Sequence, residues 1–178
     1  RARPYPVWPG RACAVQGARL MEAIVLAGGF GTRLRQVVDD VPKPMAPIAG
    51  RPFLEILLGS LAQKGFSRAV LSLGFMAEKI SGHFGSRIAG MDIAYVVEDT
   101  PLGTGGATRL AAEACTKDHV YVFNGDTYLD LEVELLEQQW QTKRHPIVVG
   151  REGTHTTRYG RVVVDGDRIV SFAEKGIT

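Results

Sequence analysis

The chain contains 178 residues, of which 45% are hydrophobic and 22% are charged, so it is of single-domain size and can bury a substantial core. The formal net charge of +2 arises in residues 1–20, which hold four of the 21 basic side chains and no acidic one, so that 17 basic and 19 acidic side chains remain. This slightly acidic body excludes the basic footprint that nucleic acids or anionic membranes require, and no apolar run approaches the ~20 residues that cross a bilayer.

Residues 1–20 contain three prolines and a tryptophan but no helical or strand periodicity. We expect a disordered extension there, with Met21 as the natural start; a non-native remnant, an upstream read-through and a basic arm that binds a partner are the alternatives. No apolar block of signal-peptide length is present, which favours a cytoplasmic location. Cys13 lies in this extension and Cys115 ends an expected helix, so we expect no native disulfide.

From residue 21 onward, strand and helix patterns alternate. Short apolar runs predict strands over residues 22–27, 69–73, 93–97 and 119–123. Amphipathic or alanine-rich segments predict helices over residues 52–64, 77–84, 104–114 and 131–143. The alternation predicts an α/β fold with three α/β/α layers, in which a Rossmann-like, mainly parallel open sheet carries helices on both faces. Residues 21–178 are expected to form one domain whose ligands bind at the carboxyl ends of the strands.

The sequence LAGGFGTRL at residues 26–34 comes directly after the apolar segment at residues 23–25 and includes the end of the first strand. Its glycines allow a tight turn that brings backbone N–H groups close to an anion, and Arg33 adds a permanently charged, planar guanidinium. The spacing matches neither a dinucleotide G-x-G-x-x-G motif nor a P-loop. We therefore expect a nucleotide polyphosphate here, with an ordinary glycine-rich strand-to-helix turn as the alternative. The candidate nucleotide-binding residues of this loop are Leu26, Ala27, Gly28, Gly29, Gly31, Thr32 and Arg33.

A single lysine, Lys43, stands between Pro42 and Pro44. Rigid flanking residues fix the direction of its ammonium group, which suits a phosphate contact. A plain extended linker is the alternative.

The strand over residues 93–97 is followed by Glu98 and by the sequence PLGTGGA at residues 101–107. Glycines such as Gly103 next to Thr104 allow a flat nucleobase or a ribose to approach the backbone. The alternative is a helix start at which small residues pack closely.

Asp126 follows the strand over residues 119–123 in the sequence FNGDT. A carboxylate at a strand's carboxyl end, next to a triphosphate, matches the preference of Mg²⁺ for one or two carboxylates and phosphate oxygens. We expect Asp126 to be a magnesium ligand, with a turn or helix-capping role as the alternative. Asp130 fits that capping role better, because it directly precedes the expected helix over residues 131–143.

The ordered set LAGGFGTRL, PKPM, PLGTGGA, FNGDT and FAEK resembles the sugar-1-phosphate nucleotidyltransferases over residues 21–178. Within that family the sequence is most similar to the D-glycero-α-D-manno-heptose 1-phosphate guanylyltransferases, and next to proteins like mannose-1-phosphate guanylyltransferase. The first motif is specific by itself, whereas the others gain their weight from their order.

The resemblance implies the fold of the nucleotide-diphospho-sugar transferases and an in-line reaction at phosphorus. A phosphate oxygen of a sugar 1-phosphate would attack the α-phosphate of a nucleoside triphosphate, and pyrophosphate would leave. By this resemblance Arg33 would grip the triphosphate, Lys43 would contact the phosphates, and Asp126 would hold the cofactor Mg²⁺. Because a sugar phosphate is mostly a dianion at neutral pH, with a second pKa of about 6, no histidine or serine base is required.

The resemblance also implies a sugar-phosphate site. Lys175 would hold the sugar phosphate and act as a further catalytic residue, Glu174 would approach the sugar hydroxyls, and Gly160 would belong to the same site.

Glu98 lies where the family often has a polar residue that faces the nucleobase. Guanine offers two adjacent donors, N1–H and N2–H₂, which one carboxylate can accept together, whereas uracil and thymine offer one donor between two acceptors and suit an amide better. We therefore expect GTP as the nucleotide, and the resemblance implies heptose 1-phosphate as the sugar substrate. Dependence on UTP or dTTP, with a merely solvated Glu98, is the alternative.

The chain departs from the family pattern at Gln36 and Gly176, where proline is common, and it stops at Thr178, where the family continues with further strands. We therefore expect the C-terminal part of the domain to be missing. A catalytically inactive, truncated or regulatory nucleotide-binding module is the alternative to an active enzyme. A cytidylyl- or molybdopterin-type transferase is a third alternative, against which the sequences PLGTGGA and NGD count.

The expected partners are a nucleoside triphosphate and a sugar 1-phosphate, without nucleic acid or membrane. A homo-oligomer is possible but is not predicted from the sequence.

Overall fold

The computed structural model describes residues 20–29, 41–150 and 160–173. The chain divides into two units between Asp130 and Leu131. Within the described residues no helix has both the length and the hydropathy needed to span a bilayer.

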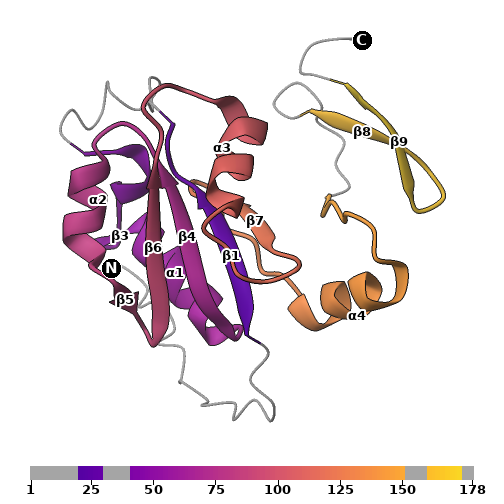
Figure 1. Cartoon of the computed structure of the whole chain (residues 1–178), viewed down its shortest axis with the longest axis horizontal. Helices are drawn as coiled ribbons and strands as arrows, with labels where there is room; N and C mark the ends of the chain where they lie inside the picture. The colour runs from indigo at the N-terminus through magenta and orange to yellow at the C-terminus, as the bar shows by residue number, and fades with distance from the viewer. Residues whose placement is uncertain (1–19, 30–40, 151–159, 174–178) are drawn as a thin grey trace, which may run out of the picture. The chain divides into compact units, whose positions relative to one another are not determined.

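The first unit is built on a five-stranded sheet with the order β5-β6-β4-β1-β7 (Figure 1). β1 pairs in parallel with β4 and with β7, β4 pairs in parallel with β6, and the short edge strand β5 is antiparallel to β6. The strands are β1 (Met21–Leu26), β4 (Phe66–Leu73), β5 (Arg87–Ile88), β6 (Met91–Val97) and β7 (Tyr121–Asn124). Their mainly parallel arrangement places four strand ends at one edge.

The central strands β1 and β4 are apolar almost throughout because both of their faces are buried. Ile24 pairs with Val70, and together with Ala111 they form a fully buried cluster on one face. Val25 and Leu71 are paired one position further on, point to the opposite face, and are also fully buried. The sheet therefore requires a covering layer on each side.

Helices α1 (Phe53–Gln63) and α3 (Gly103–Ala112) supply these two layers. α3 contributes Ala111 to the cluster with Ile24, and it lies in front of the sheet in Figure 1. α1 lies behind the sheet and buries four leucines at helical spacing: Leu54, Leu57, Leu58 and Leu61. The α/β fold with helices on both faces of a mainly parallel sheet is thus confirmed.

The smaller elements of the first unit are α2 (Ala77–Phe84), the 3₁₀ helix η1 (Lys43–Met45), and a hairpin of β2 (Pro47–Ile48) with β3 (Arg51–Pro52). α2 matches its predicted range, and α1 is one residue shorter than predicted at each end. α3 ends two residues earlier than predicted, and the strand expected over residues 119–123 lies at Tyr121–Asn124.

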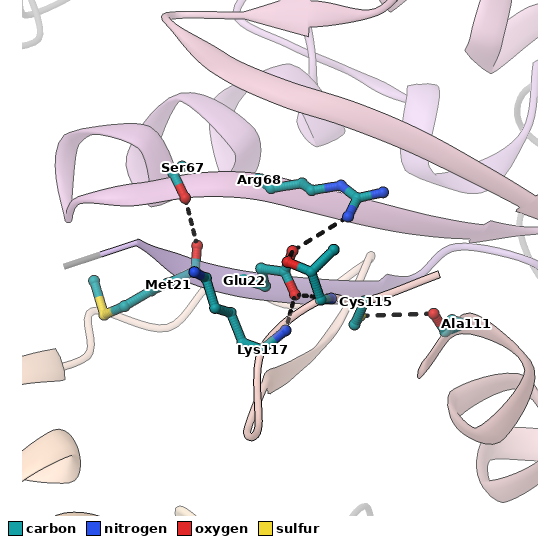
Figure 2. Close-up of polar contacts among 8 residues, drawn as sticks. Met21, Glu22, Ser67, Arg68, Ala111, Cys115 and Lys117 are labelled. Atoms are coloured by element: carbon teal, nitrogen blue, oxygen red, sulfur yellow. Dashed lines mark hydrogen bonds and ion pairs between the residues drawn. The ribbon is translucent and has the colours of Figure 1, made fainter. Parts of the chain in front are cut away.

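A buried carboxylate, Glu22, ties the amino end of the sheet together (Figure 2). Glu22 is 2% exposed and accepts hydrogen bonds from the Thr116 backbone N (2.7 Å), the Thr116 hydroxyl (2.8 Å) and the Lys117 backbone N (3.0 Å). The Arg68 guanidinium completes this cluster at 3.3 Å. Burial, the largest influence, raises the pKa of Glu22, but the hydrogen bonds from Thr116, Lys117 and Arg68 together outweigh it and leave the pKa below its usual value. The charged form of Glu22 is therefore the stable one.

The second unit contains α4 (Val133–Lys143) and a hairpin of β8 (Arg161–Asp165) with β9 (Arg168–Ala173). Lys143 at the end of α4 forms an ion pair with Asp167 in the hairpin turn. α4 begins at Val133 after Glu132, and no side chain caps it, so the prediction that Asp130 caps this helix is wrong. Asp130 lies three positions before the start of α4. It instead accepts a hydrogen bond at 2.7 Å from Lys64, the residue that directly follows α1.

Candidate active site

The candidate site lies at the carboxyl edge of the first unit's sheet, where four loops begin. Backbone hydrogen bonds extend the sheet beyond the strand ends: Ala27 N donates to Ser72 O, Glu98 N to Leu73 O, and Gly125 N to Leu26 O, each at 2.8 Å. The loops after β1, β4, β6 and β7 therefore leave the sheet in fixed register, as a ligand site on a parallel sheet requires.

Three glycines, Gly28, Gly74 and Gly125, let these loops pack backbone against backbone; we call them the glycine junction. A Cβ on Gly74 would lie 2.9 Å from the Gly28 carbonyl oxygen, and a Cβ on Gly125 would lie 2.9 Å from the Leu26 carbonyl oxygen. A Cβ on Gly28 would lie 3.0 Å from Glu98 Oε1. A side chain at Gly74 or Gly125 would require the backbone to shift, and one at Gly28 would require the Glu98 carboxylate to move slightly. Neither Gly74 nor Gly125 was predicted from the sequence, although the signal that could have found them is a glycine at the end of a predicted strand: Gly74 directly follows residues 69–73, and Gly125 lies two positions after residue 123.

Gly29 differs from the junction, because a Cβ there would meet no atom within 4 Å. Leu26 ends β1, and Ala27 is buried beside it. Thus, in the described part of the predicted nucleotide loop, Ala27 and Gly28 are closely packed, whereas Gly29 is open. Gly31, Thr32 and Arg33 lie outside the described residues.

Lys43 and Asp126, which are 83 positions apart in the sequence, form an ion pair in which the ammonium donates to Asp126 Oδ2. Both side chains are about two-fifths exposed, at 38% and 40%. This hydrogen bond holds the pKa of the Asp126 carboxyl below its usual range, more than burial raises it. Two of the residues singled out for phosphate and metal chemistry are thus brought together.

Flanking prolines hold Lys43 as the sequence suggested, but in a helical turn instead of an extended segment. Pro42 and Pro44 are buried, and Met45 N donates to Pro42 O at 2.7 Å within η1. The lysine side chain projects from an anchored backbone, which lowers the entropy lost when its ammonium is held.

Asp126 lies in a turn after β7, in which Thr127 N donates to Asn124 O at 3.3 Å and the Thr127 hydroxyl donates to Asp126 Oδ1 at 3.1 Å. Among the described residues there is no group of three or more His, Cys, Asp or Glu side chains that could hold a metal. A single, partly exposed carboxylate fits Mg²⁺, which keeps several waters and takes its remaining ligands from substrate phosphates. Asp126 can therefore contribute one ligand to such an ion.

Glu98, the predicted base-facing residue, is held at both carboxylate oxygens. The Ser72 hydroxyl donates to Oε1 at 3.0 Å, and the Leu102 backbone N donates to Oε2 at 3.0 Å. Ser72 was not predicted as a site residue; it is a fully buried polar residue inside an apolar strand. A buried polar side chain within such a strand needs a partner, and that requirement is the signal that could have found it.

The glycines at the start of α3 were predicted either to let a nucleobase or a ribose approach the backbone or to pack closely at a helix start, and the structure shows both open and packed positions. Gly103 has a φ of +69° and an open position where a Cβ would meet nothing within 4 Å, and Gly105 is equally open. Gly106 instead packs closely, because a Cβ there would lie 2.7 Å from Leu102 Cβ. Thr104 is exposed beside Gly103. The backbone at Gly103 and Gly105 is thus unobstructed on the side where a side chain would stand.

The predicted sugar-phosphate residues are described least. Gly160 belongs to the second unit and directly precedes β8, and a Cβ there would lie 3.4 Å from the Ala173 carbonyl oxygen. Glu174 and Lys175 lie outside the described residues, so their predicted roles remain predictions.

Comparison with known proteins supports the resemblance seen in the sequence. The sequence profile of the Nucleotidyl transferase family matches residues 22–176. D-glycero-alpha-D-manno-heptose 1-phosphate guanylyltransferases from Aneurinibacillus thermoaerophilus and Campylobacter jejuni are 40% and 38% identical over 88% and 87% of this chain, and over 68% and 69% of their own lengths.

A solved structure, HddC from Yersinia pseudotuberculosis, superposes with a TM-score of 0.75 at 34% identity, over 88% of this chain and 70% of that chain. The same protein complexed with GMP-PN superposes with a TM-score of 0.74. The resemblance to sugar-1-phosphate nucleotidyltransferases is therefore confirmed, and this chain belongs to the nucleotidyl transferase family.

Proposed function

We propose that the chain transfers GMP from GTP to a sugar 1-phosphate, heptose 1-phosphate in the first instance, and releases pyrophosphate. The observation that carries this proposal is the pairing of Lys43 with Asp126 beside the glycine junction, at the carboxyl edge of the sheet. The names of the two heptose 1-phosphate guanylyltransferases support the choice of substrates.

The reaction is an in-line displacement. An oxygen of the sugar phosphate forms a bond to the α-phosphorus of GTP, and the bond from that phosphorus to the bridging oxygen breaks as pyrophosphate leaves. Because the sugar phosphate, with a second pKa of about 6, is mostly a dianion at neutral pH, the protein need not remove a proton. Its contribution is to align the reactants and to neutralise their charge.

Lys43 and Arg33 supply positive charge for the triphosphate, and Lys175 supplies it for the sugar phosphate. Lys43 is already directed to this edge of the sheet by η1, and its ion pair with Asp126 is accessible to solvent, so phosphate oxygens can replace the carboxylate as its partner. Open positions at Gly29, Gly103 and Gly105 leave backbone accessible to the nucleotide.

Asp126 would hold Mg²⁺ together with phosphate oxygens and water. Bound there, the ion would neutralise charge on the triphosphate. The departure of Lys43 from Asp126 toward the phosphates would free the carboxylate for the metal, so that nucleotide and metal would bind together.

Glu98 would select the nucleobase. An ionised carboxylate offers about four acceptor positions, and Ser72 and Leu102 occupy two of them. Two remain for the adjacent N1–H and N2–H₂ donors of guanine, and GMP-PN in the related structure is a guanine nucleotide by its name.

The test is pyrophosphate release from each nucleoside triphosphate in turn, with Mg²⁺ and with either heptose 1-phosphate or mannose 1-phosphate. We expect GTP with heptose 1-phosphate to give the highest kcat/KM. A faster reaction with UTP or dTTP would contradict the choice of nucleotide. Tight GTP binding without pyrophosphate release from any pair would instead support a nucleotide-binding module without catalysis.

A further inference from the structure

We infer that Ser72 is a positioning residue for nucleobase selection, acting through Glu98. This inference rests on the proposed function, because it assumes that the Glu98 carboxylate accepts hydrogen bonds from the base. Ser72 lies within β4, is fully buried, and donates its hydroxyl proton to Glu98 Oε1 at 3.0 Å.

Three contacts define the place of the Glu98 carboxylate. Ser72 fixes Oε1, the Leu102 backbone N fixes Oε2, and the Glu98 backbone N donates to Leu73 O at 2.8 Å. Gly28 bounds the same oxygen from the nucleotide loop, since a Cβ there would lie 3.0 Å from Oε1. A carboxylate fixed in this way needs little reorganisation when a base binds.

Of these three contacts, the one from Ser72 is made by a side chain, so a substitution can remove it without changing a backbone group. The Leu102 N–H also serves the start of α3, where a carboxylate is favoured by the helix dipole. If Glu98 served only as an anchor for α3, the bond to Leu102 would suffice. The bond from Ser72 restrains the second oxygen, and the two restrained oxygens together with Cδ determine the carboxylate plane in which the remaining acceptor positions lie.

A serine on the same strand provides a matched control. Ser67 is part-buried near the amino end of β4, and its hydroxyl donates to the Met21 carbonyl oxygen at 3.2 Å (Figure 2). Ser67→Ala removes a comparable hydrogen bond from the same strand, with no contact to Glu98.

The experiment measures dissociation constants of GTP and ITP by calorimetry, with Mg²⁺ and without sugar phosphate, for the wild type, Ser72→Ala and Ser67→Ala. ITP lacks the 2-amino group, so the ratio of the two constants reports how well the carboxylate meets N2–H₂. We expect Ser72→Ala to raise the dissociation constant of GTP about tenfold and that of ITP about twofold, so that the GTP/ITP ratio of dissociation constants rises about fivefold. Ser67→Ala should leave the ratio unchanged.

A double variant separates positioning from general damage. If Ser72 acts through Glu98, Ser72→Ala should leave the ratio unchanged in a Glu98→Gln background. Ser72→Cys keeps a side chain of similar shape with a weaker donor, and we expect an intermediate ratio even if Ser72→Ala folds poorly.

The outcomes distinguish the inference from the function on which it rests. A wild type that prefers GTP, combined with an unchanged GTP/ITP ratio in both Ser72 variants, would overturn the role of Ser72 alone. A wild type that binds ITP or UTP as tightly as GTP would overturn both the base-reading role of Glu98 and this inference.

Discussion

The two ends of the first unit's sheet use charged residues in opposite ways. At the amino end, Glu22 is buried and has four hydrogen bonds (Figure 2). At the carboxyl end, Lys43 and Asp126 are paired but accessible, and Glu98 accepts one hydrogen bond at each carboxylate oxygen. The buried Glu22 carboxylate is inaccessible to a ligand and contributes to stability. The accessible groups at the carboxyl end can exchange their present partners for a ligand. The four predictions that follow test this contrast.

The largest effect is expected for Asp126→Asn at the carboxyl end. Loss of the carboxylate should lower kcat for pyrophosphate release about a thousandfold, as removal of a group that stabilises transition-state charge does. The free energy of unfolding should change by less than about 1 kcal/mol, because exposed ion pairs contribute little.

Asp130→Asn is the matched control, since Asp130 is an exposed carboxylate four positions further on that pairs with Lys64. It should retain wild-type kcat in the same assay. A large loss of activity in the control, or a small one in Asp126→Asn, would remove Asp126 from the proposed machinery.

At the amino end, Glu22→Gln should cost about 3 kcal/mol of unfolding free energy, because an uncharged amide leaves Arg68 and backbone donors poorly paired in a buried place. Urea unfolding measures this loss, and the dissociation constant for GTP should stay within about twofold.

Glu55→Gln provides the comparison, because Glu55 forms an exposed i,i+4 pair with Arg51. This substitution should cost less than about 0.5 kcal/mol. Equal losses in the two variants would show that the amino-end cluster has no special weight.

The third prediction concerns pH. The folded-state pKa of Glu22 lies below its ordinary value of 4.5. At pH values between these two pKa values, the unfolded chain therefore binds more protons than the folded one. The stability that Glu22 contributes should be fully present above the ordinary value and should be lost as the pH falls through it toward the folded-state pKa. Unfolding free energies should be measured between about pH 7 and about pH 3, the range in which carboxylates titrate. As the pH falls, the unfolding free energy should decline less steeply in Glu22→Gln than in the wild type.

The smallest effect is expected for Lys43→Met in the absence of nucleotide. Removing the ammonium from Asp126 should tighten Mn²⁺ binding about fivefold, because an exposed ion pair of about 1 kcal/mol no longer competes with the metal. Free Mn²⁺ can be followed by electron paramagnetic resonance. Lys64→Met, which removes the partner of Asp130, should leave Mn²⁺ affinity unchanged; tightening in both variants would assign the effect to net charge.

Much of the fold could be predicted because its strands are buried on both faces. Continuous apolar runs such as those around Ile24 and Val70 have no other stable place in a chain with this alternation. Helix ends were less predictable: Asp130 has the residue type of a cap, but α4 begins two residues after Leu131, and the carboxylate pairs with Lys64 instead.

The parts of the site that escaped prediction depend on contacts between distant segments. The bond from Ser72 to Glu98 spans 26 positions, and it exists because β4 and β6 are neighbours with Ser72 paired to Val96. The tight approach of Gly74 to Gly28 likewise requires the register of β1 against β4. Sequence patterns indicate which residues end strands, but side-chain partners follow from strand order.

The glycine junction has a consequence for how this edge of the molecule can change. Since Gly74 and Gly125 are packed against the main chain of a neighbouring segment at 2.9 Å, an alanine at either position must displace that segment as well as its own, whereas an alanine at Gly28 would first meet the Glu98 carboxylate at 3.0 Å. Substitutions are therefore expected to be tolerated better at open positions such as Gly29 and Gly105, where a Cβ would meet no atom within 4 Å. A library that holds the three junction glycines fixed and varies the open positions should therefore retain far more folded members than one that varies all five.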